Sequence, residues 1–217
     1  MALENALRIR ERISGRFSLD SAETLNNLAG ILRDGGDVDG ALEMMAEVLE
    51  TRRFLMRDDH PLVIQSMAGL AVMAATKGDL ARAEALLNEV IELDRRVFGV
   101  NHPALGVDLS SLSKVLTLQN RFTEAEPLLR ESYEIRKRYL PADHPARLAT
   151  EVALGRCLME LQKESDGAKF LADALSWSMD SARRGEPFWS GVAKELHSYY
   201  TRTGLEAKAA EMAALQK

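Results

Sequence analysis

The stretch Asp59-His60-Pro61 sets the organisation of this chain, because its His-Pro pair returns at two later places. The pair recurs as His102-Pro103 and as His144-Pro145, so the two steps along the chain are equal in length. One further step of the same length reaches Glu186-Pro187, where the proline is kept and the histidine is not. A constant period of roughly 20 to 50 residues is typical of proteins built from stacked repeats. The sequence therefore predicts a repeat array.

One period holds two helical patterns separated by a break. In residues 18–59, apolar residues three and four apart run from Ala22 to Leu32, and a second set runs from Ala41 to Leu49. The intervening Gly35-Gly36 is a turn signal. Each repeat is therefore predicted to be a helix–turn–helix. We expect one array over 1–217 without separable domains, made of a leading half-repeat helix at 1–17 and repeats at 18–59, 60–101, 102–143, 144–185 and 186–217.

Small residues recur in register along these repeats. They are Ala29 and Ala71 in the first helix, Gly36, Gly78 and Gly204 at the turn, and Ala41, Ala83, Ala125 and Ala209 in the second helix. With these residues the chain resembles the tetratricopeptide repeat family, and its 42-residue kinesin-light-chain type in particular. The resemblance covers almost the whole chain. It implies an all-α, right-handed α-solenoid of stacked helix–turn–helix units around one continuous core.

Composition and charge restrict the classes of function. With 46% hydrophobic and 28% charged residues, the chain has the composition of an ordinary soluble protein. Its apolar runs are too short for a membrane span and its N-terminus lacks a signal-peptide pattern, so we expect a cytoplasmic protein. The formal net charge of −5 makes nucleic acid an unlikely partner, because binding along a phosphate backbone needs a basic face. A local basic patch is still compatible with that charge.

The three repeated histidines and the single Cys157 are the residues that could suggest a metal or catalytic site. Stacked helices lie about 8–10 Å apart, whereas a histidine nitrogen must come within about 2 Å of zinc. We therefore interpret His60, His102 and His144 as helix caps. Cys157 has no histidine on its own helix face, and we expect it in the core. The sequence predicts no catalytic residue, no metal site and no cofactor, and we expect the chain not to be an enzyme.

Basic residues recur near the end of each second helix. Cations there complement the negative end of the helix dipole and can pair with glutamates one turn away. We interpret the row as solvated helix ends; the alternative is a docking stripe for an acidic partner or RNA. The row consists of Arg10, Arg52, Arg53, Arg95, Arg96, Arg136, Lys137 and Arg138.

The resemblance also implies where a partner would bind. Members of the family hold peptides or partner domains in a concave groove lined by the first helix of each repeat. In the light-chain type, paired asparagines in that helix help to hold the peptide backbone, and here the pair is present only as Asn26-Asn27. Val152 is another expected groove position. The candidate partner-binding residues are Asn26, Arg33, Gln65, Ser110, Lys114, Arg156, Lys194 and Arg202.

The later groove positions are basic although the chain as a whole is acidic. One hypothesis is that the groove takes an acidic segment or a C-terminal carboxylate, which lysine and arginine would bind through charge-assisted hydrogen bonds. The alternative is that Lys114, Arg156, Lys194 and Arg202 belong to an ordinary solvated helix face.

Large aromatic residues gather late in the chain, and they allow two interpretations. They can close the end of the core, or they can form a surface for self-association. The residues are Trp177, Phe188, Trp189, Tyr199 and Tyr200. For the chain as a whole we predict a scaffold or adaptor that binds a protein or peptide. A regulatory or sensor segment of a larger multidomain signalling or effector protein is the alternative.

Overall fold

The structure is a computed structural model that describes residues 17–179 and 187–215. In this part of the chain it contains ten helices and no strand, which confirms the predicted all-α class. The first helices of the repeats are α2 (Leu19–Asp34), α4 (Pro61–Lys77), α6 (Pro103–Leu118), α8 (Pro145–Glu160) and α10 (Pro187–Arg202). The second helices are α3 (Val38–Leu55), α5 (Leu80–Val97), α7 (Phe122–Tyr139), α9 (Glu164–Met179) and α11 (Glu206–Ala214).

The helices keep the period of the sequence. Each first helix begins one full period after the previous first helix, and each second helix begins one full period after the previous second helix. The prediction of a repeated helix–turn–helix is confirmed. The predicted leading helix at 1–17 lies almost entirely outside the described residues.

The turn inside each repeat contains one residue in the left-handed region. Gly36, Gly78 and Gly204 hold this place in three repeats, with φ values of 88°, 92° and 73°. Asn120 and Gln162 hold it in the other two, each with φ of 60°. Glycine adopts this conformation without a steric penalty, asparagine tolerates it, and glutamine is strained there. Backbone geometry therefore favours the turn glycines predicted from the sequence, and two repeats use another residue at the cost of strain.

The His-Pro pairs begin the first helices, as predicted. The Nδ1 atom of each histidine accepts a hydrogen bond from the backbone N–H two residues later, at 3.2 Å for His60, 3.3 Å for His102 and 3.2 Å for His144. The following proline occupies the first helical position, where its missing N–H would have no partner in the helix. These histidines are used as helix caps.

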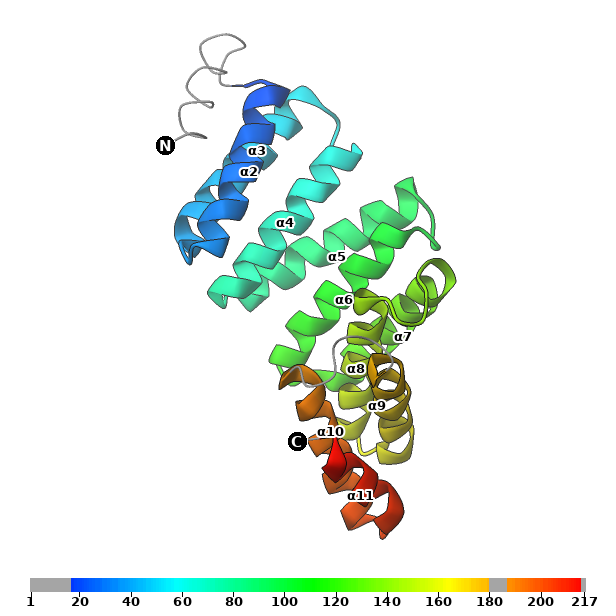
Figure 1. Ribbon diagram of the computed structural model, residues 1–217. Coiled ribbons are helices and arrows are strands. Elements are labelled where there is room, and N and C mark those ends of the chain that lie inside the picture. Colours follow the sequence, from blue (N-terminus) through cyan, green and yellow to red (C-terminus); the bar gives the residue numbers. More distant parts are fainter. Residues whose placement is uncertain (1–16, 180–186, 216–217) are drawn as a thin grey trace. The chain divides into compact units, whose positions relative to one another are not determined.

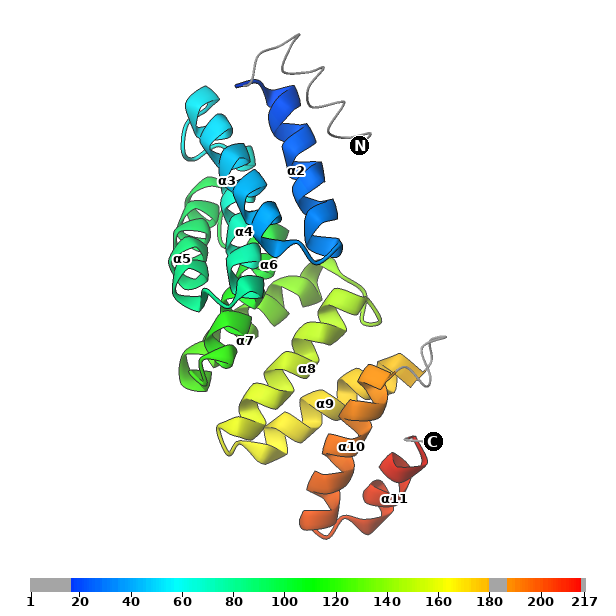
Figure 2. The ribbon, with the colours of Figure 1, turned by 90° about the vertical axis from the view of Figure 1, so that its left-hand side faces the viewer.

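The chain divides into two compact units, Met1–Val115 and Leu116–Lys217. In the first unit, α2 packs on α3, α3 on α4 and α4 on α5 (Figure 1). In the second unit, α7 packs on α8, α8 on α9, α9 on α10 and α10 on α11 (Figure 2). Consecutive helices in each unit thus share a core of buried alanine, leucine and other apolar side chains. That the whole chain forms a single array stays a prediction.

Helices α8 and α9 approach each other closely through two glycines. A Cβ atom added to Gly155 would lie 3.0 Å from the carbonyl oxygen of Gly167, and one added to Gly167 would lie 2.7 Å from the carbonyl oxygen of Gly155. Earlier repeats have alanine or serine at these two positions, including Ala71 and Ala83. The two helices have therefore closed into the space that a methyl group would occupy.

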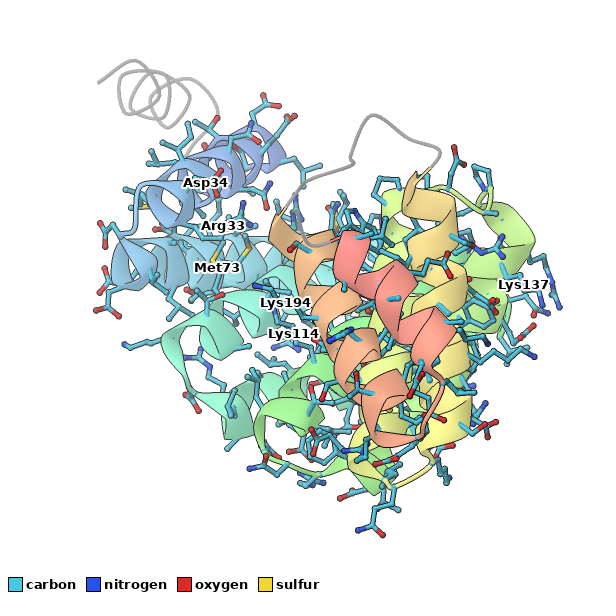
Figure 3. The ribbon with its side chains drawn as sticks, turned by 60° about the horizontal axis from the view of Figure 1, so that its bottom comes forward. Arg33, Asp34, Met73, Lys114, Lys137 and Lys194 are labelled. Carbon is cyan, nitrogen blue, oxygen red and sulfur yellow. The ribbon has the colours of Figure 1, made fainter. Side chains whose placement is uncertain are left out.

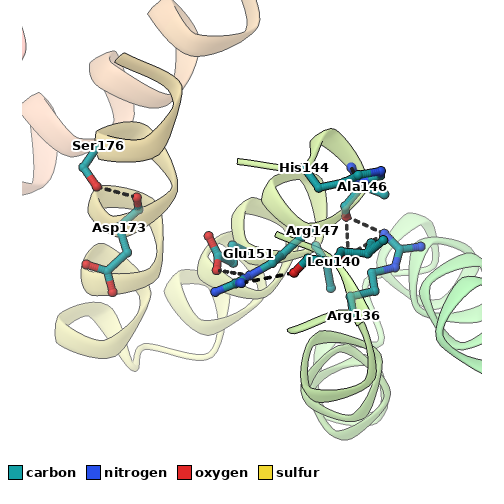
Figure 4. Close-up of polar contacts among 9 residues, drawn as sticks. Arg136, Leu140, His144, Ala146, Arg147, Glu151, Asp173 and Ser176 are labelled. Atoms are coloured by element: carbon teal, nitrogen blue, oxygen red, sulfur yellow. Dashed lines mark hydrogen bonds and ion pairs between the residues drawn. The ribbon is translucent and has the colours of Figure 1, made fainter. Parts of the chain in front are cut away.

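Two arginines, the buried Arg52 and the half-buried Arg136, link consecutive repeats. Near the end of α3, Nη1 of Arg52 donates to the carbonyl oxygen of Leu62 at 2.9 Å and to Oγ of Ser66 at 2.7 Å, both on α4. At the equivalent place in the second unit, Nη1 of Arg136 donates to the carbonyl oxygen of Ala146 and to Oγ1 of Thr150 at 2.7 Å (Figure 4). These polar bridges join one repeat to the next.

The expectation that every basic residue in the helix-end row is solvated is therefore wrong for Arg52 and Arg136. The side chain of Arg52 is only 6% exposed, and burial lowers the pKa of both guanidinium groups. They point away from water because the next helix offers a hydroxyl and a carbonyl oxygen, and buried charges need such partners. In contrast, Arg53 is exposed and pairs with Asp58 at 3.3 Å and with Glu89 at 3.5 Å.

A buried ion pair replaces two leucines in the α8 repeat. Leu105 and Leu109 are fully buried, and the equivalent positions one repeat later hold Arg147 and Glu151. Nε of Arg147 lies 3.5 Å from Oε1 of Glu151 (Figure 4). Arg147 also lies over the ring of Tyr133, 5.9 Å from its centroid, and burial raises the pKa of Glu151. This repeat thus contains a polar cluster where its predecessor has aliphatic contacts.

Candidate binding surface

In the first unit, the candidate residues lie on α2, α4 and α6. Arg33 and Gln65 are exposed, while Asn26 is half-buried. Arg33 pairs with the adjacent Asp34 at 2.8 Å (Figure 3). Gln65 accepts a long hydrogen bond of 3.5 Å from Arg52. Exposed apolar side chains, Ile31, Val72 and Val107, occur on the same three helices. The first-helix surface of this unit thus offers both polar and apolar groups.

Further along the first unit, α6 carries Ser110 and Lys114. Ser110 is half-buried, and its carbonyl oxygen accepts a hydrogen bond of 2.8 Å from the hydroxyl of Ser113. Lys114 is exposed (Figure 3). These two residues lie one helical turn apart, so they share a face of α6.

In the second unit, candidate residues from two successive first helices meet around a hollow of about 480 Å³. Arg156 on α8 and Arg202 on α10 both line it. The other lining residues are Met159, Glu160, Glu164, Glu195, Ser198 and Tyr199. Lys194, one turn before Ser198 on α10, is exposed (Figure 3). The structure therefore brings together Arg156 and Arg202, but it does not place Lys194 in the lining.

Both arginines of this hollow are bound by glutamates of neighbouring helices. Arg156 holds Glu195 through three contacts of 2.8 to 3.1 Å, and Arg202 holds Glu164 at 2.6 Å. Glu160 adds a third carboxylate, so the lining carries two cations and three anions. Sequence reasoning missed Glu164 and Glu195 because each lies 38 or 39 residues from its arginine, in another repeat. The signal that could have found these pairs is an arginine and a glutamate separated by slightly less than one repeat period.

Two of the C-terminal aromatic residues, Trp189 and Tyr200, are core residues. Trp189 and Tyr200 are each 6% exposed and belong to a buried cluster with Leu148 and Leu171. Self-association through these two rings is therefore not available in this structure, and the end-closing interpretation holds for them. Val152 also lies in that cluster, so its expected place in the groove is wrong. The side chains of Trp177 and Phe188 lie outside the described part.

Cys157 is buried, and its thiol donates to the carbonyl oxygen of Phe122 at 3.4 Å. Burial, with a smaller contribution from Glu126, raises the pKa of this thiol to about 11. A thiol with such a pKa is a poor nucleophile at neutral pH. Cys157 is a core residue, as expected.

The described residues contain neither a metal-binding cluster nor a membrane span. Outside 1–16, 180–186 and 216–217, no group of three or more histidine, cysteine, aspartate or glutamate side chains is placed to hold a metal ion. Among the described helices, none is both long and apolar enough to cross a membrane.

Comparison with known protein families identifies the repeats of this chain. The sequence profile of the tetratricopeptide repeat family matches residues 20–96 and 65–138, which together cover more than half of the chain. No curated protein sequence is significantly similar to the chain.

Solved structures share the fold at low sequence identity. A Podosopora anserina protein with nearly identical TPR-like repeats, assigned as a kinesin light chain, has a TM-score of 0.76 and 22% identity over 89% of this chain and 92% of its own. BtubC from P. vanneervenii has a TM-score of 0.82 and 15% identity, and the match covers 97% of this chain and 85% of the BtubC chain. YrrB, described as a TPR protein with an unusual peptide-binding site, has a TM-score of 0.63 and 15% identity. The match covers 97% of this chain and 90% of the YrrB chain.

Proposed function

Because the chain belongs to the tetratricopeptide repeat family, we propose that it is a non-catalytic scaffold that binds a protein or peptide along its first helices. The single observation that carries this proposal is the hollow between α8 and α10, which Arg156 and Arg202 line from successive repeats. Exposed polar and apolar groups on α2, α4 and α6 support it in the other unit. We place this activity in the cytoplasm, where a lone buried cysteine such as Cys157 stays reduced.

The charges of the hollow indicate what kind of partner it fits. Each arginine is already paired, so an acidic side chain or a C-terminal carboxylate of the partner would replace Glu195 or Glu164 against a guanidinium group. A released glutamate then needs a cation, because an unpaired charge in an interface is costly. A partner segment with both an acidic and a basic group satisfies this requirement. Such exchange gives specificity more than raw affinity.

The test is recovery of partners by the full-length chain from a lysate of its source, with chemical cross-linking and mass spectrometry. The groove variant combines Arg156→Gln with Arg202→Gln, and the control variant combines Lys137→Gln with Lys169→Gln on α7 and α9. Both variants remove two exposed cations, and circular dichroism checks that both are folded. We expect the groove variant to lose partners that the control retains. Equal recovery by both variants would exclude the hollow as the binding site.

A peptide array then tests the charge of the partner. Peptides with an acidic residue or a free C-terminus next to a basic residue should bind more tightly than uniformly basic peptides, and salt should weaken this binding. Arg156→Glu should weaken it while the helical signal stays unchanged. Preference for basic peptides would contradict the proposed use of the arginines.

A further inference from the structure

The junction between α5 and α6 breaks the pattern that its neighbours follow. At the α3–α4 and α7–α8 junctions, an arginine donates to a hydroxyl group of the next helix, from Arg52 to Ser66 and from Arg136 to Thr150. The equivalent positions between α5 and α6, one repeat after Arg52 and Ser66, are Asp94 and Asp108. Two carboxyl groups therefore face each other where a cation and a hydroxyl meet elsewhere.

Both carboxyl groups are inside the protein. Asp94 is 1% exposed and Asp108 is 7% exposed. Apart from the carboxyl group of Asp108, no N–H or O–H group of the described residues donates a hydrogen bond to either carboxylate oxygen of Asp94. The side chain of Asp108 lies within hydrogen-bonding reach of Asp94. Two ionised carboxylates repel each other strongly away from water, so one of the pair holds a proton.

The charges around the pair indicate which group holds it. Among the described residues, the charged groups that act on the two carboxyls are the carboxyls themselves and His102 at the start of α6. The ring of His102 stacks on Phe98 with 4.6 Å between centroids, and a charge on it favours an ionised Asp94. Burial, together with Asp94, raises the pKa of Asp108 to about 8. Asp108 is thus the donor and Asp94 the acceptor.

We propose that Asp94 and Asp108 share one proton at neutral pH, and that release of this proton in mildly alkaline solution loosens the α5–α6 junction. The direction follows from the pKa of Asp108, which is higher in the folded chain than its unfolded value of about 3.9. The stabilising contribution is complete below the unfolded value and is lost as pH rises to about 8. The arginine junctions contain no carboxyl pair, so the change is confined to one place in the repeats. This device does not depend on the proposed partner binding.

The direct test follows the carboxyl carbons of the full-length chain by NMR with ¹³C-labelled aspartate. We expect one aspartate to titrate above about pH 7, far from the ordinary value near 3.9. This signal should disappear in Asp108→Asn. If every aspartate of the wild-type chain titrates below about pH 6, the shared proton does not exist and the proposal falls. The wild-type titration can therefore refute the proposal by itself, without any variant having to fold.

A second test measures urea unfolding between about pH 6 and pH 9. The folding equilibrium constant of the wild-type chain should fall by up to about tenfold per pH unit over the lower part of this range. Asp108→Asn keeps a donor without a titrating proton, and the double variant Asp94→Arg with Asp108→Ser copies the neighbouring junction. Both should lose this pH dependence, whereas the exposed control Asp143→Asn should keep it. The same pH dependence in Asp108→Asn and the wild type would overturn the proposal.

Hydrogen exchange locates the change within one chain. After correction for intrinsic base catalysis, amides near Asp94 and Asp108 should exchange faster at about pH 8.5 than at pH 6.5, while those around Arg52 and Ser66 should not. Equal changes at both junctions would show a general loosening and exclude a device at α5–α6.

Discussion

Replacement of Gly155 by alanine tests the close approach of α8 and α9. A Cβ atom at this position would lie 2.8 Å from Cγ and 2.9 Å from Cδ2 of Leu171, and 3.0 Å from the carbonyl oxygen of Gly167. Ordinary contacts between such atoms begin near 3.5 Å. Leu171 is fully buried and the third contact is backbone, so the helices must move apart. Overpacking of this kind costs about 1–3 kcal/mol.

A matched glycine separates this steric cost from helix propensity. Alanine is better than glycine in a helix interior by about 1 kcal/mol. Gly30, inside α2, has nothing within 4 Å of an added Cβ atom, so Gly30→Ala should stabilise the chain by up to about 1 kcal/mol. The two variants share the propensity gain and differ in the steric cost. The free energy of unfolding of Gly155→Ala should therefore be about 2 kcal/mol below that of Gly30→Ala.

The assay is urea denaturation followed by circular dichroism, with both variants and the wild type measured under identical conditions. We expect Gly155→Ala to unfold at lower urea than the wild type, and Gly30→Ala at the same or higher urea. Stabilisation of both variants by equal amounts would refute the reasoning, since it would mean that α8 and α9 can separate to the spacing of the other repeats without cost.

Three other substitutions or treatments have expected outcomes. Gln162→Gly should raise the melting temperature, because it removes about 1 kcal/mol of backbone strain at a left-handed position. Gly78→Ala should lower the melting temperature, because it introduces such strain. A lower melting temperature for Gln162→Gly, or a higher one for Gly78→Ala, would contradict the turn geometry. Arg147→Leu alone should cost about 3–5 kcal/mol in urea unfolding, because it leaves the buried Glu151 without a cation and with only the Tyr133 hydroxyl as a partner. The double variant Arg147→Leu with Glu151→Leu should be near neutral, and equal losses would argue against the ion pair. Because the pKa of Cys157 is raised to about 11, its labelling by a disulfide reagent at about pH 8 should be at least 100-fold slower in the folded chain than in urea. The labelling rate of the folded chain should rise with pH. Fast labelling of the folded chain at about pH 8 would contradict the burial of this thiol.

The helices and turns could be predicted from the sequence because each repeat encodes them locally. The His-Pro cap, the apolar spacing and a turn glycine such as Gly78 lie within a few residues of the element that they define. The period then transfers a strong signal in one repeat to a weaker one, such as the turn at Gln162. Local chemistry and repetition are sufficient for this part of the fold.

Contacts between repeats are the part that the sequence does not reveal. The charge pattern predicts Arg52 as a solvated helix end, because its acceptors on α4 lie 10 and 14 residues away and are ordinary residues when taken singly. Arg156 and Arg202 are exposed, and their glutamate partners come from other helices, which their own sequence neighbourhood does not indicate. Matching the end of one repeat with the start of the next would expose both kinds of pairing.

The junction residues also determine which repeats could be exchanged in evolution or by design. Deletion of residues 60–101 would bring Arg52 against Asp108, a pairing of opposite charges, whereas duplication of the same segment would bring Asp94 against Ser66. Circular dichroism of the two recombinant chains should show the shortened one folded at neutral and alkaline pH alike. A repeat can thus be exchanged only if the residue at the end of its second helix still matches the residue that it contacts on the next first helix. The segment that can be exchanged as a whole therefore runs from one such contact to the next.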